Sequence, residues 1–146
     1  MTQLSEHFTL EEAVFSSTAM RLGIANNPDD ATLAIMQTAA VQLEKVRELL
    51  GFPMHVDSWY RSEPLNTAVG GAGHSAHETG WAIDFICPDF GTPAKIAEAI
   101  LGAGLVFDQI IMEGAWVHIS FDPKARTMAL TATFVNGKAS YANGIA

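Results

Sequence analysis

The chain has 146 residues, of which 49% are hydrophobic and 16% charged, and its formal net charge at pH 7 is −8. This length and apolar content predict one domain over residues 1–146, built around one core. The lysines and arginines are few and scattered, so the sequence lacks the basic patch that nucleic-acid binding or an anionic membrane surface requires. We therefore expect no nucleic-acid partner.

The single cysteine, Cys87, excludes an internal disulfide. The first residues do not form a charged segment followed by a long apolar run, which predicts a chain without a signal peptide. No apolar run reaches the roughly eighteen residues of a membrane-spanning helix. We expect a protein that is made in the cytoplasm and does not insert into a membrane.

Capping signals predict two helices in the first third of the chain. Thr9 and Glu12 have the spacing of a capping box and predict a short helix that ends near Ser16. Asp30 is expected to cap a longer helix over residues 31–50, before a glycine and a proline that end it. The apolar residues of this helix recur at steps of three and four, which predicts one buried stripe of Leu33, Met36, Ala40, Leu43, Val46 and Leu50.

Shorter elements follow in the rest of the chain. We expect strands at residues 54–59, 80–86, 106–113, 116–121 and 128–135, helices at 62–69 and 92–102, a glycine- and histidine-containing loop at 70–79, and a turn at Asn136-Gly137. Because helices come first and most strands later, the predicted class is α+β. We expect a small single domain with a largely antiparallel sheet and the N-terminal helices packed against it.

An acid lies in the middle of an apolar strand. In the expected strand over residues 80–86, Trp81, Ile83 and Phe85 point to one face, and Asp84 points to the other. An unpaired buried carboxylate is very unfavourable, so Asp84 should be paired, protonated or bound to a metal. From this strand alone, a structural aspartate that accepts backbone hydrogen bonds and a metal ligand remain equally open.

His77 lies seven residues before Asp84, at the end of the expected loop, with Gly80 between them to allow a tight turn. A lone histidine is more often a structural or surface residue than a ligand. A histidine one turn before a buried aspartate favours a shared metal site.

A hairpin supplies the third histidine and a second acid. Gly114-Ala115 is expected to form a two-residue turn, in which Glu113 faces Trp116 on the same side of the sheet as His118. Glu113 and His118 are then diagonal neighbours with Cα atoms roughly 7–8 Å apart. This separation suits a carboxylate that reaches a water on the metal.

Two histidines, one carboxylate and an open fourth position describe a catalytic zinc site, with a nearby Glu as the general base. The residues available for these roles are His77, Asp84, His118 and Glu113. Arg61 follows the expected strand over residues 54–59, where its guanidinium is suited to a peptide carboxylate or a developing oxyanion. A solvated surface arginine is the alternative.

Residues 75–84, SAHETGWAID, resemble the S-x-H-x-x-G-x-A-x-D signature of the M15 family of zinc peptidases, the D-alanyl-D-alanine carboxypeptidases and related phage endolysins. Residues 116–118 are similar to the segment that carries the third metal ligand of that family. Tyr60-Arg61-Ser62 with Asn66 is similar to its Y-R-S-x-x-x-N stretch. The likeness spans residues 4 to about 121, and the opening residues and the Ala68-Val69-Gly70-Gly71 segment resemble the phage-type subgroup.

The resemblance implies that His77, Asp84 and His118 bind one zinc ion per chain. It also implies that Arg61 contacts the substrate or the transition state, that Ser75 supports the site, and that the fold is a small α+β domain with an antiparallel sheet. Several members place the base three residues before the last histidine, where this chain has an alanine, so Glu113 is the expected substitute. Two further residues are expected at the substrate, Trp116 in the cleft and His74 in the loop, although a loop histidine is equally often solvated.

The expected function is zinc-dependent hydrolysis of amide bonds in the stem peptides of peptidoglycan. We expect a monomeric phage or prophage lysis enzyme, made in the bacterial cytoplasm without a signal peptide and released to the cell wall through a holin. Carboxypeptidase and endopeptidase action both remain open.

Two other interpretations also remain. The chain could be a non-catalytic, metal-stabilised module that binds wall peptides. It could also lack zinc altogether, with His77 at the surface, Asp84 a buried hydrogen-bond acceptor and His118 an ordinary strand histidine.

Overall fold

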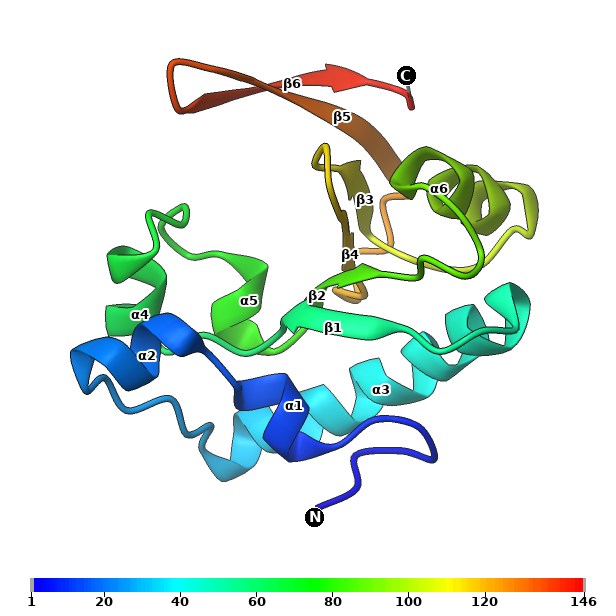
Figure 1. Cartoon of the computed structure of the whole chain (residues 1–146). Helices are drawn as coiled ribbons and strands as arrows, with labels where there is room; N and C mark the ends of the chain where they lie inside the picture. Colours follow the sequence, from blue (N-terminus) through cyan, green and yellow to red (C-terminus); the bar gives the residue numbers. More distant parts are fainter. Residues whose placement is uncertain (1, 146) are drawn as a thin grey trace.

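The computed structural model describes residues 2–145, and its α+β class is the predicted one (Figure 1). The helices are α1 (Leu10–Val14), α2 (Ser17–Leu22), α3 (Asp30–Leu50), α4 (Glu63–Ala68), α5 (Ala76–Thr79) and α6 (Pro93–Gly102). The strands are β1 (His55–Ser58), β2 (Ala82–Ile86), β3 (Gln109–Met112), β4 (Val117–Ser120), β5 (Met128–Val135) and β6 (Lys138–Asn143).

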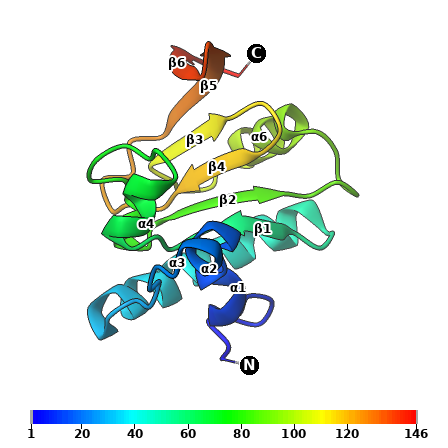
Figure 2. The ribbon, with the colours of Figure 1, turned by 60° about the vertical axis from the view of Figure 1, so that its left-hand side comes forward.

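The strands form one sheet in the order β1-β2-β4-β3-β5-β6. Four of its neighbouring pairs are antiparallel, as predicted for most of the sheet, whereas β5 runs parallel to β3. The parallel pair arises because the chain leaves β4 and returns along the far side of β3 through residues 121–127. Figure 2 shows β1, β2, β4 and β3 side by side, with the β5–β6 hairpin at the end of the sheet.

Helix α3 is the main support of the sheet. Five of the six residues of its predicted stripe are confirmed as core, because Met36, Ala40, Leu43 and Val46 are fully buried and Leu50 nearly so, whereas Leu33 is only partly buried against the core. The predicted cap is wrong by one residue. Asp29 is the N-cap and accepts a hydrogen bond from the backbone N–H of Thr32, while Asp30 is already helical. Gly51 ends the helix in the left-handed conformation, as expected.

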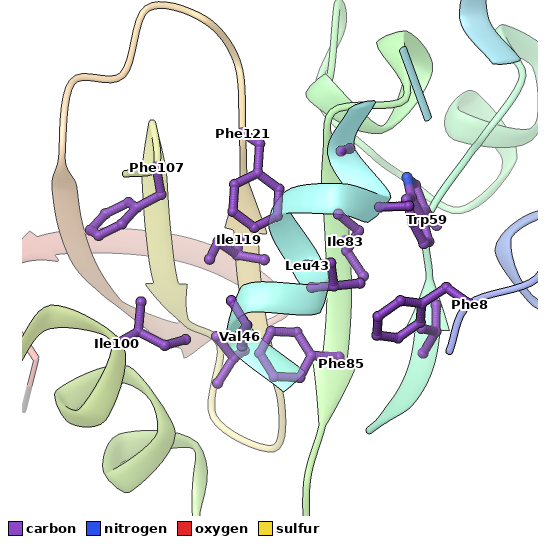
Figure 3. Close-up of a cluster of buried hydrophobic side chains, with 14 of the residues drawn as sticks. Phe8, Leu43, Val46, Trp59, Ile83, Phe85, Ile100, Phe107, Ile119 and Phe121 are labelled. Carbon is purple, nitrogen blue, oxygen red and sulfur yellow. The ribbon is translucent and has the colours of Figure 1, made fainter. Parts of the chain in front are cut away.

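The core lies between helices α3 and α6 and one face of the sheet (Figure 3). Ile83 and Phe85 on β2 pair with Ile119 and Val117 on β4, so one row of apolar side chains crosses both strands. Trp59 is fully buried beside this core and donates from its indole N–H to the carbonyl oxygen of Gly80. The polar face of the same strands is thereby left on the opposite side of the sheet.

The structure corrects several local predictions. The loop expected at residues 70–79 contains α5, which Ser75 and Glu78 cap with a capping box. Helix α2 was not predicted; Ser16 caps it and Gly23 ends it. The strands expected at residues 80–86 and 106–113 are shorter than predicted, whereas β5 has the predicted bounds.

Among residues 2–145, no helix has the length and apolar character needed to cross a bilayer. The longest helix, α3, is amphipathic and packs on the sheet.

Candidate active site

Asp84 lies on the face of β2 that points away from helices α3 and α6. The register of β2 and β4 sets it directly opposite His118, whose Nδ1 is 2.8 Å from the Asp84 Oδ1. The carboxylate is 6% exposed, and the partners found for it are the side chains of His77, His118 and Arg61. These contacts match the ligand interpretation better than that of an aspartate held by backbone N–H groups.

Helix α5 carries His77 to the same point. Ser75 accepts a hydrogen bond from the His77 backbone N–H and thereby fixes the start of this short helix. The His77 Nδ1 lies 2.7 Å from the carbonyl oxygen of Trp59. Because a carbonyl only accepts hydrogen bonds, Nδ1 must carry the proton, which leaves a lone pair on Nε2 facing Asp84. His77 is 3% exposed, so the interpretation of it as a surface residue is wrong.

The three side chains form a set of donor atoms suited to a metal. One nitrogen from His77, one from His118 and one oxygen from Asp84 all lie within 4.8 Å of one another. The imidazole rings of the two histidines are inclined at 70°, with their centroids 5.1 Å apart. Nitrogen and carboxylate donors in this number are those of zinc sites with an open position.

The protonation states of the cluster favour a cation. Burial lowers the pKa of His77, so its imidazole is neutral. Burial acts to raise the pKa of Asp84, but its hydrogen bond with His118 contributes to a pKa well below the usual range, so the group is a carboxylate. The His77 Nε2 lone pair and the Asp84 Oδ1 then face each other at 3.2 Å. Two acceptors this close repel each other unless a cation lies between them, so the residues present fit a metal ion.

Arg61 lies in a fixed position beside the three candidate metal ligands. Its Nε donates to Ser58 Oγ at 3.1 Å, its Nη1 to Asn66 Oδ1 at 3.3 Å, and its Nη2 lies 3.5 Å from Asp84 Oδ2. The side chain is only 18% exposed, so it is not the solvated surface arginine of the alternative interpretation.

Asn66 connects Arg61 to the surrounding loop through hydrogen bonds. It is 3% exposed and also donates to the carbonyl oxygen of Ala72 and to Glu78 Oε2. A Cβ on Gly71 would lie 2.1 Å from Asn66 Oδ1, so glycine is required at this close approach. The sequence indicated Asn66 only through the family stretch and assigned it no role.

Glu113 and Trp116 lie at the tip of the β3–β4 hairpin. The Glu113 N–H donates to the carbonyl oxygen of Trp116, so these residues face each other as predicted. Ile111 pairs with His118, which makes Glu113 the diagonal neighbour of His118 on the same face. Burial raises the pKa of Glu113, and the Asp84 charge adds to this, while His118 and Arg61 oppose it.

The three candidate metal ligands, Arg61, Glu113 and Trp116 line one open cleft of about 740 Å³. Every site residue predicted from the sequence is on its surface, namely Arg61, His74, Ser75, His77, Asp84, Glu113, Trp116 and His118. Within residues 2–145, the buried indole N–H of Trp116 has no hydrogen-bond partner. The structure adds a rim that was not predicted, where the guanidinium of Arg126 donates twice to the buried Asp108 carboxylate.

Comparison with known proteins agrees with this geometry. No curated protein matches the chain. A family model described as Peptidase M15 matches residues 6–120, which include every predicted site residue. The matched segment covers more than half of the 146 residues. The chain therefore belongs to the M15 peptidases, a family of zinc-dependent metallopeptidases.

Proposed function

We propose that the protein hydrolyses an amide bond in the stem peptides of peptidoglycan and serves as a phage or prophage lysis enzyme. The observation that carries the proposal is the convergence of His77, Asp84 and His118 beside Glu113 and Arg61 in one open cleft. The phage-type likeness of the opening residues supports the lysis role, and family membership supports a metallopeptidase.

His77, Asp84 and His118 would hold the zinc ion. When bound, zinc supplies a Lewis acid for the scissile carbonyl and lowers the pKa of its water to roughly 7. The hydrogen bond from His77 Nδ1 to the Trp59 carbonyl keeps the imidazole in the required tautomer and orientation. The buried position of Asp84 on β2 keeps its carboxylate in place.

Glu113 is the proposed general base. Its carboxylate takes the proton of the attacking water and then delivers it to the leaving amine, so one side chain serves both halves of the reaction. Its raised pKa makes it a stronger base than an exposed glutamate.

Arg61 is the proposed anion contact. Its guanidinium is oriented by Ser58 and Asn66 before any substrate arrives, so little conformational entropy is lost when it binds a substrate carboxylate or oxyanion. Such an anchor serves a carboxypeptidase through the terminal carboxylate and an endopeptidase through the developing oxyanion.

The test is digestion of purified wall fragments by the wild type, with and without chelator, followed by detection of new amino termini. We expect new termini only with metal present. Glu113→Gln should lower turnover by about 10²–10⁴-fold while zinc still binds. Glu98→Gln is the matched control, because Glu98 is exposed on α6, outside the cleft.

Two results would contradict the proposal in different ways. Binding of wall fragments without any new termini would favour the non-catalytic module. Full turnover by Glu113→Gln would move the base to another residue.

A further inference from the structure

The β5–β6 hairpin lies after the segment matched by the family model, which ends at residue 120. The sheet register nevertheless connects it to the active site. Asp84 pairs with His118, His118 with Ile111, and Ile111 with Leu130 of β5. Because side chains paired across a sheet share a face, Leu130 points to the same face of the sheet as Asp84 and His118.

The same face continues to the end of the hairpin. Phe134 follows Leu130 at an even spacing along β5, and Tyr141 of β6 pairs with Ala132, which also shares this face. Leu130, Phe134 and Tyr141 all line the active-site cleft. In Figure 1 the hairpin projects on the same side as α5, which lines the opposite part of the cleft together with the loop over residues 69–75.

The hairpin side of the cleft, which we call the wall, differs from the floor of the cleft in the polarity of its side chains. The floor carries charged and metal-binding groups, whereas the hairpin presents Phe134, which is 50% exposed, and Tyr141, which is 55% exposed. Exposed aromatic side chains beside a binding site are typical contact residues, since they offer large area with little entropy loss. Burial raises the pKa of the Tyr141 phenol, with the charges of Glu113 and Asp84 adding to the effect, so its hydroxyl stays a donor.

The dimensions indicate which part of a ligand this wall would touch. Phe134 lies four residues along β5 from Leu130, a distance of about 13 Å in an extended strand. Leu130 itself lies two strands away from His118, about 10 Å across the sheet, so Phe134 lies on the order of 16 Å from the candidate metal ligands. An extended peptide whose scissile bond lies at these ligands therefore meets Phe134 with residues about five positions away.

We propose that the β5–β6 hairpin is a specificity-determining wall of the active site, on which Phe134 and Tyr141 bind uncharged, apolar parts of a wall peptide remote from the scissile bond. The inference rests on the proposed function, because it assigns the hairpin to the same substrate. Phe134 and Tyr141 would act on the binding of long substrates and leave the chemical step itself unchanged.

The test compares a long and a short substrate with single variants of the hairpin. On a complete stem peptide attached to its sugar, Phe134→Ala and Tyr141→Ala should each lower kcat/KM about tenfold, chiefly through KM. On a dipeptide whose single amide bond is the scissile bond, neither variant should differ from the wild type. Tyr141→Phe separates the hydroxyl from the ring and should retain most of the binding.

Val135→Ala is the matched control, because Val135 is 61% exposed on the same hairpin but alternates to the opposite face. Unchanged melting temperatures would show that all four variants fold. The inference is overturned if Phe134→Ala, Tyr141→Ala and Val135→Ala have the same kcat/KM on the long substrate.

Failure of the proposed function gives a different result. In that case the wild type cuts neither substrate, and calorimetric binding of the uncut stem peptide tests the hairpin by itself. Weaker binding by Phe134→Ala and Tyr141→Ala than by Val135→Ala supports the wall, and equal binding overturns it.

Discussion

At the scale of single residues, the site depends on side chains whose ionisation is set by their surroundings. Asp84 and His77 are buried together, and each is in the protonation state that a metal requires. Glu113 is only half-buried at the edge of the cluster, and its pKa moves in the direction that suits a base. These directions follow from position in the fold, so they lead to a prediction about pH.

The kcat/KM of the wild type should have an acidic limb above pH 4.5, the ordinary pKa of a glutamate. A base works only when ionised, and burial raises the pKa of Glu113, so activity is lost as the pH falls through this raised value. A pH–rate profile measures the limb, with metal content followed at each pH to exclude metal loss. A limb at or below 4.5, or the same limb in the residual activity of Glu113→Gln, would contradict the assignment.

Much of the residue-level site could be predicted from sequence, for physical reasons. Asp84 stands out because an acid in an apolar strand requires a partner, and His77 and His118 are the histidines that the motif spacing brings near it. The contacts of Arg61 with Asn66 and Asp84 could not be predicted, because they depend on how the loop after β1 folds over the sheet.

At the scale of elements, the N-terminus of α3 gives different roles to two adjacent aspartates, because Asp29 is the N-cap and Asp30 is the first helical residue. Asp29→Ala should lower the melting temperature at neutral pH, because its side chain accepts the Thr32 N–H, whereas Asp30→Ala should change it little. The hydrogen bond to Thr32 lowers the pKa of Asp29 below 3.8, so its contribution is full above that pH and is lost as the pH falls below it. Thermal unfolding at neutral and acidic pH checks both points, and equal effects of the two variants would contradict the assignment of Asp29 as the cap.

The turn between α5 and β2 approaches α3 closely at Gly80. Gly80 has a φ of 92°, and a Cβ there would lie 2.8 Å from the Met36 Cγ. Gly80→Ala should therefore destabilise the fold by about 1–3 kcal/mol, whereas Gly102→Ala, with open space around it, should leave stability unchanged or slightly raised. Denaturant unfolding measures both, and a neutral Gly80→Ala would show that α5 and α3 are not tightly packed there.

Most elements with strong local signals were predicted, whereas the strand pairing that is set by distant contacts was not. Helix α6 begins at the predicted Thr92-Pro93 and ends at the predicted Gly102, since caps and glycines act locally. Helix α5 was missed although Ser75 and Glu78 have the spacing of a capping box. The parallel pairing of β5 with β3 has no local signature, because register is fixed by packing across the sheet.

At the scale of the whole molecule, the sheet separates two functions. One face packs on α3 and α6 and provides stability, whereas the other carries the cleft from Asp84 across His118 to the β5–β6 hairpin. Metal binding should therefore add stability without rearranging the core. Zinc should raise the melting temperature of the wild type, because a ligand that binds only the folded state stabilises it.

The most direct test of the central claim is the metal content of protein purified without chelators. The wild type and Glu113→Gln should each hold one zinc ion per chain, and His118→Ala should lose it together with the peptidase activity. A wild type without stoichiometric transition metal, or a His118→Ala variant that keeps both metal and activity, would contradict the claim that His77, Asp84 and His118 form the metal site.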